Sequence, residues 1–218
     1  MEIKVFKEIM EGNIQLAEQN KSLFKDRKIT AINVMASPGA GKTSTIMRLI
    51  SMLTEKVNFG VIEGDIASAI DAEKFEKIGI PVVQINTGGG CHLDANMIQG
   101  VMEDLNIEDD SILFIENVGN LICPSSFDLG ESLKLVIASV PEGHDKPYKY
   151  TSMFEAADFI ILNKVDLAPF IDFDRDAFYK GIKALNPDVR VFEVSCKTGE
   201  GFIALADYLI QLHEESKK

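Results

Sequence analysis

The segment M-A-S-P-G-A-G-K-T at residues 35–43 constrains the fold of this 218-residue chain more than any other. The apolar run over residues 30–35 is typical of a strand, and the run over residues 44–53 is typical of a helix. A strand, a loop of small residues ending in Gly-Lys-Thr and a helix together form a phosphate-binding P-loop. The general pattern has Gly where this chain has Ala36, but Ala is also small. The segment therefore predicts an α/β fold built around a phosphate site.

The small residues of this loop allow successive backbone amides to surround phosphate oxygens, and the following helix adds the partial positive charge of its N-terminus. Lys42 can reach the β- and γ-phosphates of a nucleotide, and Thr43 can offer its hydroxyl to Mg²⁺. The residues predicted to surround the phosphates are Gly39, Ala40, Gly41, Lys42, Thr43 and Ser44.

Short apolar runs alternate with helix-like segments along the rest of the chain. The predicted strands cover residues 59–63, 82–85, 112–115, 133–139, 159–162 and 189–194, and the predicted helices cover 67–78, 93–105, 148–157, 174–185 and 202–213. This alternation predicts a three-layer α/β/α fold with a mostly parallel sheet. An amphipathic pattern over residues 2–24 predicts an N-terminal helix, at about residues 1–25, that packs on the core. No linker or repeat interrupts the chain, so we expect one domain over residues 1–218.

Composition excludes several classes of protein. A formal net charge of −12 argues against nucleic-acid binding through a basic surface. No apolar run approaches the about 18 residues of a membrane span, and charges interrupt the N-terminal apolar positions, so we expect neither a membrane protein nor a signal peptide. Three cysteines without an export signal indicate thiols or metal ligands in the cytoplasm rather than disulfides.

The segment N-K-V-D at residues 163–166 follows a predicted strand and indicates which base the site selects. The carboxylate of Asp166 can accept hydrogen bonds from guanine N1–H and the exocyclic amine, whereas adenine presents an unprotonated N1 there. Asn163 and the stem of Lys164 can position the base and brace the P-loop. The loop Ser195-Cys196-Lys197 would contact the base from the other side. Together with the P-loop, these residues favour GTP as the ligand.

Two acidic residues at strand ends are candidates for Mg²⁺ and for hydrolysis. Asp65 can hold the cation directly or through water, and it can also cap the following helix. Glu116 can complete the Mg²⁺ shell or orient the attacking water, and the amide of Gly119 can bind the γ-phosphate. We expect Lys42, Asp65 and Glu116 to form the catalytic set. No histidine or glutamine is placed as a strong base, which predicts slow hydrolysis used as a switch.

A second group of residues suits a different metal. Cys91 and His92 end a glycine-rich loop, and Cys123 lies seven residues after Glu116. Thiolate and imidazole suit Zn²⁺, Ni²⁺ or Cu(I) rather than Mg²⁺. By spacing alone, buried thiols and a surface histidine are the more common explanation. Three ligands also leave a tetrahedral site one short, so the residues alone leave this question open. We interpret Cys196, in the loop that would contact the base, as a structural residue and not as a metal ligand.

The motifs together resemble the HypB family of nickel-incorporation GTPases, SIMIBI-class P-loop proteins of [NiFe]-hydrogenase maturation. The resemblance extends from about Thr30 to Gly201, and its most specific parts are C-H-L-D-A and E-N-V-G-N-L-I-C-P. It implies a homodimer in the GTP state with a Ni²⁺ or Zn²⁺ site at the subunit interface, whose ligands match Cys91, His92 and Cys123. It also implies a nickel accessory protein and the hydrogenase large-subunit precursor as partners. The cysteine-rich nickel motif and the histidine-rich tract of some relatives are missing, so we expect no N-terminal nickel store.

One short segment carries both a nucleotide residue and a metal ligand. Glu116 and Cys123 share it, so a rearrangement around the γ-phosphate would move a metal ligand.

Three other functions remain open. A urease-type nickel accessory GTPase shares the nucleotide motifs but normally carries Cys-Pro-His, whereas His92 follows Cys91 directly. A P-loop small-molecule kinase would give no reason for Asn163 and Asp166. A metal-binding protein with a vestigial nucleotide site is the remaining alternative.

Overall fold

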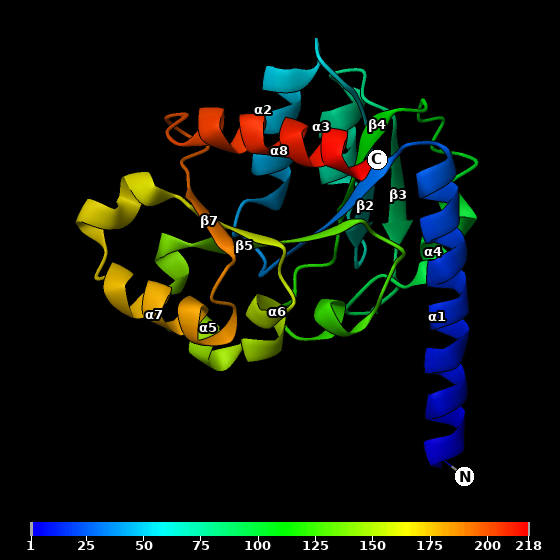
Figure 1. The fold of residues 1–218 in the computed structure, drawn as a ribbon, viewed down its shortest axis with the longest axis horizontal. Coiled ribbons are helices and arrows are strands. Elements are labelled where there is room, and N and C mark those ends of the chain that lie inside the picture. Colours follow the sequence, from blue (N-terminus) through cyan, green and yellow to red (C-terminus); the bar gives the residue numbers. More distant parts are fainter. Residues whose placement is uncertain (1, 218) are drawn as a thin grey trace.

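The computed structural model describes the backbone of residues 2–217 and the side chains of residues 10–217. A sheet of seven parallel strands lies at the centre of this part of the chain, in the order β3-β2-β4-β1-β5-β6-β7 (Figure 1). The strands are β1 Thr30–Ala36, β2 Asn58–Asp65, β3 Val82–Asn86, β4 Ser111–Glu116, β5 Leu133–Ser139, β6 Phe159–Asn163 and β7 Arg190–Glu193.

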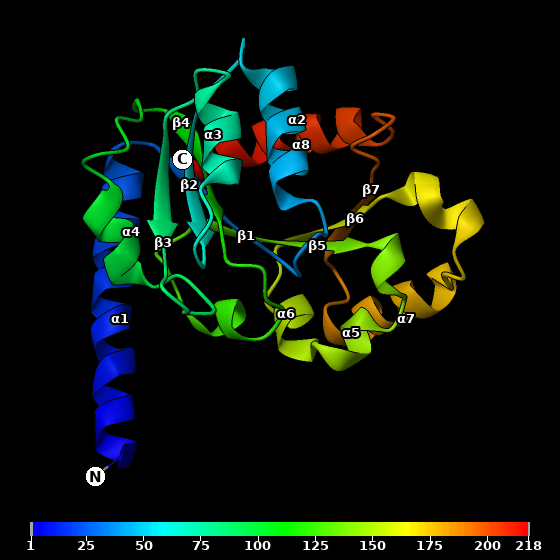
Figure 2. The same cartoon turned by 180° about the vertical axis from the view of Figure 1, so that it is seen from behind.

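Helices cover both faces of the sheet, which confirms the predicted three-layer α/β/α fold. They are α1 Glu2–Asp26, α2 Lys42–Leu53, α3 Ile70–Glu76, α4 Ala95–Val101, α5 Lys146–Lys149, α6 Thr151–Glu155, α7 Arg175–Leu185 and α8 Phe202–Ser216. Both views show α2, α3 and α8 on one side of the sheet and α5 to α7 on the other (Figures 1 and 2). Short 3₁₀ turns occupy Cys123–Ser126, Val140–Glu142 and Val165–Phe170.

The two central strands explain why the apolar runs are continuous rather than alternating. Every residue of β1 and β4 is buried, because helices pack on both faces of these strands. On one face, Val34 and Phe114 pack with Leu49 of α2 and Leu205 of α8. Each fully buried side chain of this kind contributes roughly 1.5–3 kcal/mol from the removal of apolar surface from water.

Three predicted helices differ from those in the structure, each for a local reason. The helix predicted over 67–78 is shortened to α3, because the amides of Ala67 and Ser68 donate to Asp65 in a turn before it. The helix predicted over 93–105 begins only at Ala95, because Asp94 caps it by accepting a hydrogen bond from Met97 N at 2.8 Å, and it ends at Val101. The helix predicted over 148–157 is divided into α5 and α6 at Tyr150, whose backbone is not helical. Pro147 lies in the first turn of α5, where its missing N–H costs nothing.

The predicted N-terminal helix packs against the core, and its first turns extend beyond the rest of the molecule (Figure 1). Asn20 of α1 donates from Nδ2 to the carbonyls of Ala95 and Leu129, at 2.9 and 3.0 Å. Asn13 accepts from Ala95 N and donates to Asp128 O, each at 2.9 Å. Helix α1 therefore fixes the start of α4 and the loop before β5. Among the described residues, no helix combines the length and the apolarity needed to cross a membrane.

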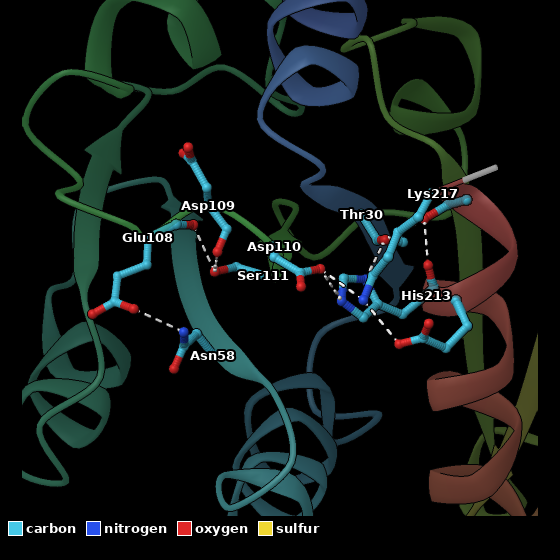
Figure 3. Close-up of polar contacts among 10 residues, drawn as sticks. Thr30, Asn58, Glu108, Asp109, Asp110, Ser111, His213 and Lys217 are labelled. Atoms are coloured by element: carbon cyan, nitrogen blue, oxygen red, sulfur yellow. Dashed lines mark hydrogen bonds and ion pairs between the residues drawn. The ribbon is translucent and has the colours of Figure 1, made fainter.

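The end of α8 is fixed to the opposite edge of the sheet from the P-loop by a polar cluster (Figure 3). His213, which is 1% exposed, has Nδ1 2.7 Å from Oγ1 of Thr30 and Nε2 3.3 Å from Oδ1 of Asp110. Lys217 binds Asp110 at 2.7 Å and Glu214 at 2.8 Å. Burial and the positive charge of Lys217 lower the pKa of His213, against the opposing effect of Asp110 and Glu214. The neutral imidazole is therefore the form that fits this cluster.

This cluster predicts that the contribution of His213 to folding stability decreases in mild acid. Because the pKa of His213 is lower in the folded chain than its ordinary value of about 6.5, the unfolded chain binds the proton first as the pH falls through that value. Between pH 7.5 and 5.5, the free energy of unfolding measured with urea should change less favourably in the wild type than in His213→Gln. Glu63 and Glu116, whose pKa values are raised by burial, act in the opposite direction in both proteins and cancel in this comparison. His144→Gln is the matched control and should keep the wild-type dependence. Parallel pH profiles for wild type and His213→Gln would contradict this assignment.

Candidate nucleotide and metal sites

The P-loop joins the end of β1 to the start of α2 through two glycines with positive φ. Gly39 has φ +76° and Gly41 has φ +103°, a region that side chains with a Cβ rarely adopt. A Cβ at Gly41 would also collide with the amide nitrogen of Asn163. Glycine is therefore required here both for the backbone turn and for the close approach of a neighbouring loop.

Lys42 and Thr43 begin α2 and face Glu116 at the end of β4. The Thr43 hydroxyl donates to Oε1 of Glu116 at 2.9 Å, and the Lys42 ammonium lies 4.0 Å from the same oxygen. The second oxygen, Oε2, is buried and has no hydrogen-bond partner among the described residues. Burial raises the pKa of Glu116 to about 7, although Lys42 and Thr43 act to lower it. An unpartnered carboxylate oxygen beside a hydroxyl is a donor set that fits Mg²⁺.

Asp65 at the end of β2 caps a turn and not the following helix, as one of its two expected roles required, because α3 begins only at Ile70 with Ala69 as its N-cap. Its Oδ1 accepts from Ala67 N at 2.9 Å and from Ser68 N at 2.7 Å. These backbone hydrogen bonds are the main reason why the pKa of Asp65 is lowered, and the charge of Lys42 contributes less. The expected role of Asp65 at Mg²⁺ stays a prediction.

The sequence analysis missed Glu63, which lies two residues before Asp65 on β2. Glu63 pairs in register with Glu116 on the neighbouring strand β4 and is 3% exposed. Carboxylate oxygens of Glu63, Asp71 and Glu116 all lie within 4.8 Å of one another. Burial and the charge of Glu116 raise the pKa of Glu63 to about 7. A glutamate at the end of the apolar run F-G-V-I-E was the available signal for this residue.

The residues predicted to select the base line a common cavity of about 260 Å³. Its walls comprise Gly41, Ser44, Asn163, Lys164, Asp166, Leu167, Cys196 and Lys197. Seven of these eight residues belong to the predicted nucleotide site, and Leu167 is the addition. A wider cavity of about 590 Å³ adjoins it and shares Ser44, Cys196 and Lys197. Cys196 therefore belongs to the nucleotide side of the molecule, consistent with its structural interpretation.

Asn163 is the residue that joins this cavity to the P-loop. Its Nδ2 donates to Ala40 O at 2.9 Å, and its Oδ1 accepts from Lys164 N at 2.7 Å and Cys196 N at 3.4 Å. Lys164 adopts φ +61° and reaches back to Gly39 O with its ammonium at 2.6 Å. Ser195 donates its hydroxyl to Oδ1 of Asp166 at 2.6 Å. These bonds hold the Asp166 carboxylate in the cavity before any ligand arrives.

The side chains of Cys91, His92 and Cys123 form a second group. Their ligand atoms all lie within 4.8 Å of one another, and Sγ of Cys91 is 3.5 Å from Nδ1 of His92. The His92 ring stacks on Phe127 with 3.8 Å between centroids. A hydrogen bond to Cys123, together with burial, raises the pKa of Cys91, whereas burial lowers the pKa of His92. The donor set suits Zn²⁺ or Ni²⁺, and the group has three ligands among the described residues.

The segment 117–123 connects the two groups. Its residue Gly119 lies against Pro38 of the P-loop, so closely that a Cβ would come 2.9 Å from the Pro38 ring. Asn120 N donates to Ala36 O at 2.9 Å, and Asn120 Nδ2 donates to Cys91 O at 3.2 Å. Oδ1 of Asn120 accepts from Ile122 N at 2.9 Å, which shapes the turn into Cys123. The side chain of Asn120 thus contacts the loop of Cys91 and the turn before Cys123, while its backbone amide binds the start of the P-loop.

Comparison with known proteins identifies the family of this chain. The model for the nucleotide-binding domain of the CobW/HypB/UreG family matches residues 30–193. The hydrogenase maturation factor HypB of Rhizobium leguminosarum bv. viciae is 46% identical over 207 residues, covering 95% of this chain and 69% of that protein. The probable hydrogenase maturation factor HypB of Methanocaldococcus jannaschii is 40% identical and covers 99% of this chain and 97% of the relative.

A solved structure agrees with these sequence matches. The crystal structure of HypB from Helicobacter pylori in complex with nickel matches with a TM-score of 0.88 at 35% identity, covering 95% of this chain and 97% of that one. The chain spans about two thirds of the length of several relatives that it matches. The chain belongs to the CobW/HypB/UreG family of nucleotide-binding P-loop proteins and, within it, to the hydrogenase maturation factors HypB.

Proposed function

We propose that this protein is a GTP-hydrolysing metallochaperone that inserts nickel into the precursor of the [NiFe]-hydrogenase large subunit. In this proposal GTP drives homodimerisation, and Cys91, His92 and Cys123 hold the metal at the subunit interface. A nickel accessory protein supplies the metal, and the protein acts in the cytoplasm. The observation that carries the proposal is the segment 117–123, which is hydrogen bonded to the P-loop and to the Cys91 loop.

The P-loop, the loop that carries Asp166 and the segment 117–123 support the nucleotide part of the proposal. Lys42 and the backbone of residues 39–44 would bind the phosphates, and Asp166 would accept from guanine. Thr43 and Glu116 would hold Mg²⁺, which neutralises charge on the phosphates when it is bound. Gly119 N–H would bind the γ-phosphate, a role supported by its close packing on Pro38.

The metal part rests on the three clustered ligands and on their incomplete shell. A tetrahedral site needs a fourth ligand, which water or a second subunit would supply. Because the thiols and the imidazole must lose protons before they bind a cation, metal affinity should decrease at low pH. The nickel in the related crystal structure belongs to that protein and supports Ni²⁺ as the cargo here.

The coupling between the two sites would pass through Asn120. A γ-phosphate that draws Gly119 inward would pull on a segment whose next residue holds the Cys91 carbonyl and whose end carries Cys123. GTP binding would then change metal affinity, and the metal would change GTP affinity by the same factor. Neither the kinase alternative nor a vestigial nucleotide site gives a reason for this connection.

Replacing Asp166 by Asn tests the choice of base. The substitution removes a charged acceptor for two guanine hydrogen bonds, so GTP affinity should decrease roughly 10- to 100-fold. Xanthine carries a carbonyl where guanine carries the amine, so the variant should bind xanthosine triphosphate better than the wild type does. Nucleotide titrations measure both effects, with the exposed Asp188→Asn as the control. Equal displacement of GTP by ATP in the wild type would contradict guanine selection.

Gel filtration with analysis of bound metal tests the metallochaperone mechanism. With a non-hydrolysable GTP analogue the chain should elute as a dimer, and its Ni²⁺ affinity should differ from that of the GDP form by about 5- to 150-fold. Cys123→Ala should bind GTP but lose the metal, whereas Cys196→Ala should keep it. A wild-type chain that remains monomeric and metal-free with both nucleotides would overturn the mechanism.

Asn120→Asp tests the coupling path separately from either site. Asp keeps the acceptor used by Ile122 N but cannot donate to Cys91 O. The ratio of Ni²⁺ affinities in the two nucleotide states should fall towards one, while GTP and Ni²⁺ each still bind. Asn86→Asp adds the same charge at the end of β3, keeps the acceptor used by Gln84, and should retain the wild-type ratio. An unchanged ratio in Asn120→Asp would place the coupling elsewhere.

A further inference from the structure

We infer that Glu63, with Asp71, belongs to the divalent-cation site beside the P-loop and shares the cation with Glu116. This inference rests on the proposed nucleotide site and extends it by two residues. Neither residue was expected to bind a cation, because Asp65 and Glu116 accounted for the acidic positions recognised in the sequence. Strand register, buried oxygens without partners and the position of Lys42 support this assignment.

Strand register brings the two glutamates together. Strands β2 and β4 are parallel neighbours, and Glu63 is the register partner of Glu116. Both residues point to the α2 and α3 side of the sheet, because Val61 and Phe114, two residues before each, pack in the cluster with Leu49. Asp71 in the first turn of α3 completes the group from above this face. Three carboxylates from three elements thus converge within 4.8 Å.

One oxygen of each glutamate lacks the partner that a buried polar atom normally has. Oε2 of Glu63 and Oε2 of Glu116 are each buried without a hydrogen-bond partner among the described residues. Leaving one such atom unpaired costs about 1–3 kcal/mol, and more if the group is charged. Two buried oxygens without partners, at the ends of the neighbouring strands β2 and β4, indicate that the site is completed by a ligand with positive charge.

Two lysines supply positive charge to this group: the ammonium of Lys74 binds Asp71 at 2.5 Å, and Lys42 contributes only while it is free to face Glu116. The Lys42 ammonium lies 4.0 Å from Glu116 in the structure. A P-loop lysine turns to the β- and γ-phosphates when a nucleotide binds, which would leave the carboxylates without that neighbour. A divalent cation that arrives with the nucleotide would restore the balance of charge. Nucleotide binding and cation binding at Glu63 would therefore favour each other.

The ligand atoms distinguish this cation from the nickel that the protein is proposed to carry. Carboxylate oxygens alone favour Mg²⁺ or Mn²⁺, whereas the thiols of Cys91 and Cys123 favour Ni²⁺ or Zn²⁺. The alternative is that Glu63 is protonated and only fills space at the edge of the core. Under that alternative Glu63→Gln, which has the same shape without the charge, would leave cation dependence unchanged.

Mg²⁺ and Mn²⁺ titrations of fluorescent GTP-analogue binding to the full chain test the inference. In Glu63→Gln, the Mg²⁺ concentration for half-maximal nucleotide binding should rise about 10- to 100-fold. Nucleotide affinity without added metal should not decrease, because the substitution leaves the P-loop in place and removes a negative charge beside the phosphates. Asp71→Asn should shift the same midpoint, and Glu63→Asp, which restores the charge on a shorter side chain, should give an intermediate value.

Glu73→Gln is the matched control. Glu73 lies on the same helix as Asp71 and is exposed, with Lys77 at 3.7 Å. Its midpoint should equal that of the wild type. A wild-type midpoint in Glu63→Gln, together with a raised midpoint in Glu116→Gln, would overturn the inference and leave the proposed function standing. If the wild type bound GTP without any dependence on Mg²⁺, the cation site at Glu116 and the inference would both fail.

Discussion

The parallel pairing of β1 with β4 at the centre of the sheet is the constraint on which both candidate sites depend. It sets Val34 opposite Glu116, so that the P-loop leaving β1 and the segment leaving β4 start side by side. From there Thr43 reaches the Glu116 carboxylate, and Asn120 returns a hydrogen bond to Ala36. Parallel strands place all their carboxyl ends at one edge, which is why loops distant in sequence meet there.

Two groups of side chains that suit different metals lie on loops joined by one short segment. Hard carboxylate and hydroxyl oxygens gather on the α2 side of the sheet, whereas the thiols and the imidazole lie in the loops beyond β3 and β4. The segment 117–123 leads from one group to the other and is bonded to the P-loop and to the Cys91 carbonyl. Helix α1 fixes the start of α4 and the residues before β5. The Cys/His loops thus lie between the segment 117–123 and the residues that α1 fixes.

Much of the fold was predictable because its strands are apolar and its loops are chemically distinctive. Runs such as I-L-F-I at residues 112–115 have few alternatives to a buried strand, and N-K-V-D and G-K-T mark their own loops. Helix ends were less predictable, since they depend on local bonds such as the Asp94 cap and on the non-helical backbone at Tyr150. Glu63 and Asn120 were passed over because their importance comes from partners on other strands and loops.

The sequence by itself determined the α/β class, the phosphate loop and the residues that we expect to favour guanine, because each depends on neighbours close in the chain. It also supplied the thiols and the imidazole, but not their meeting, since Cys91 and Cys123 lie on loops after different strands. Only the tertiary structure decided that these three ligands converge, that Asn163 braces the P-loop, and that Glu63 faces Glu116. The physical reason is register, because parallel pairing fixes which distant residues share an edge, and no local pattern encodes that pairing.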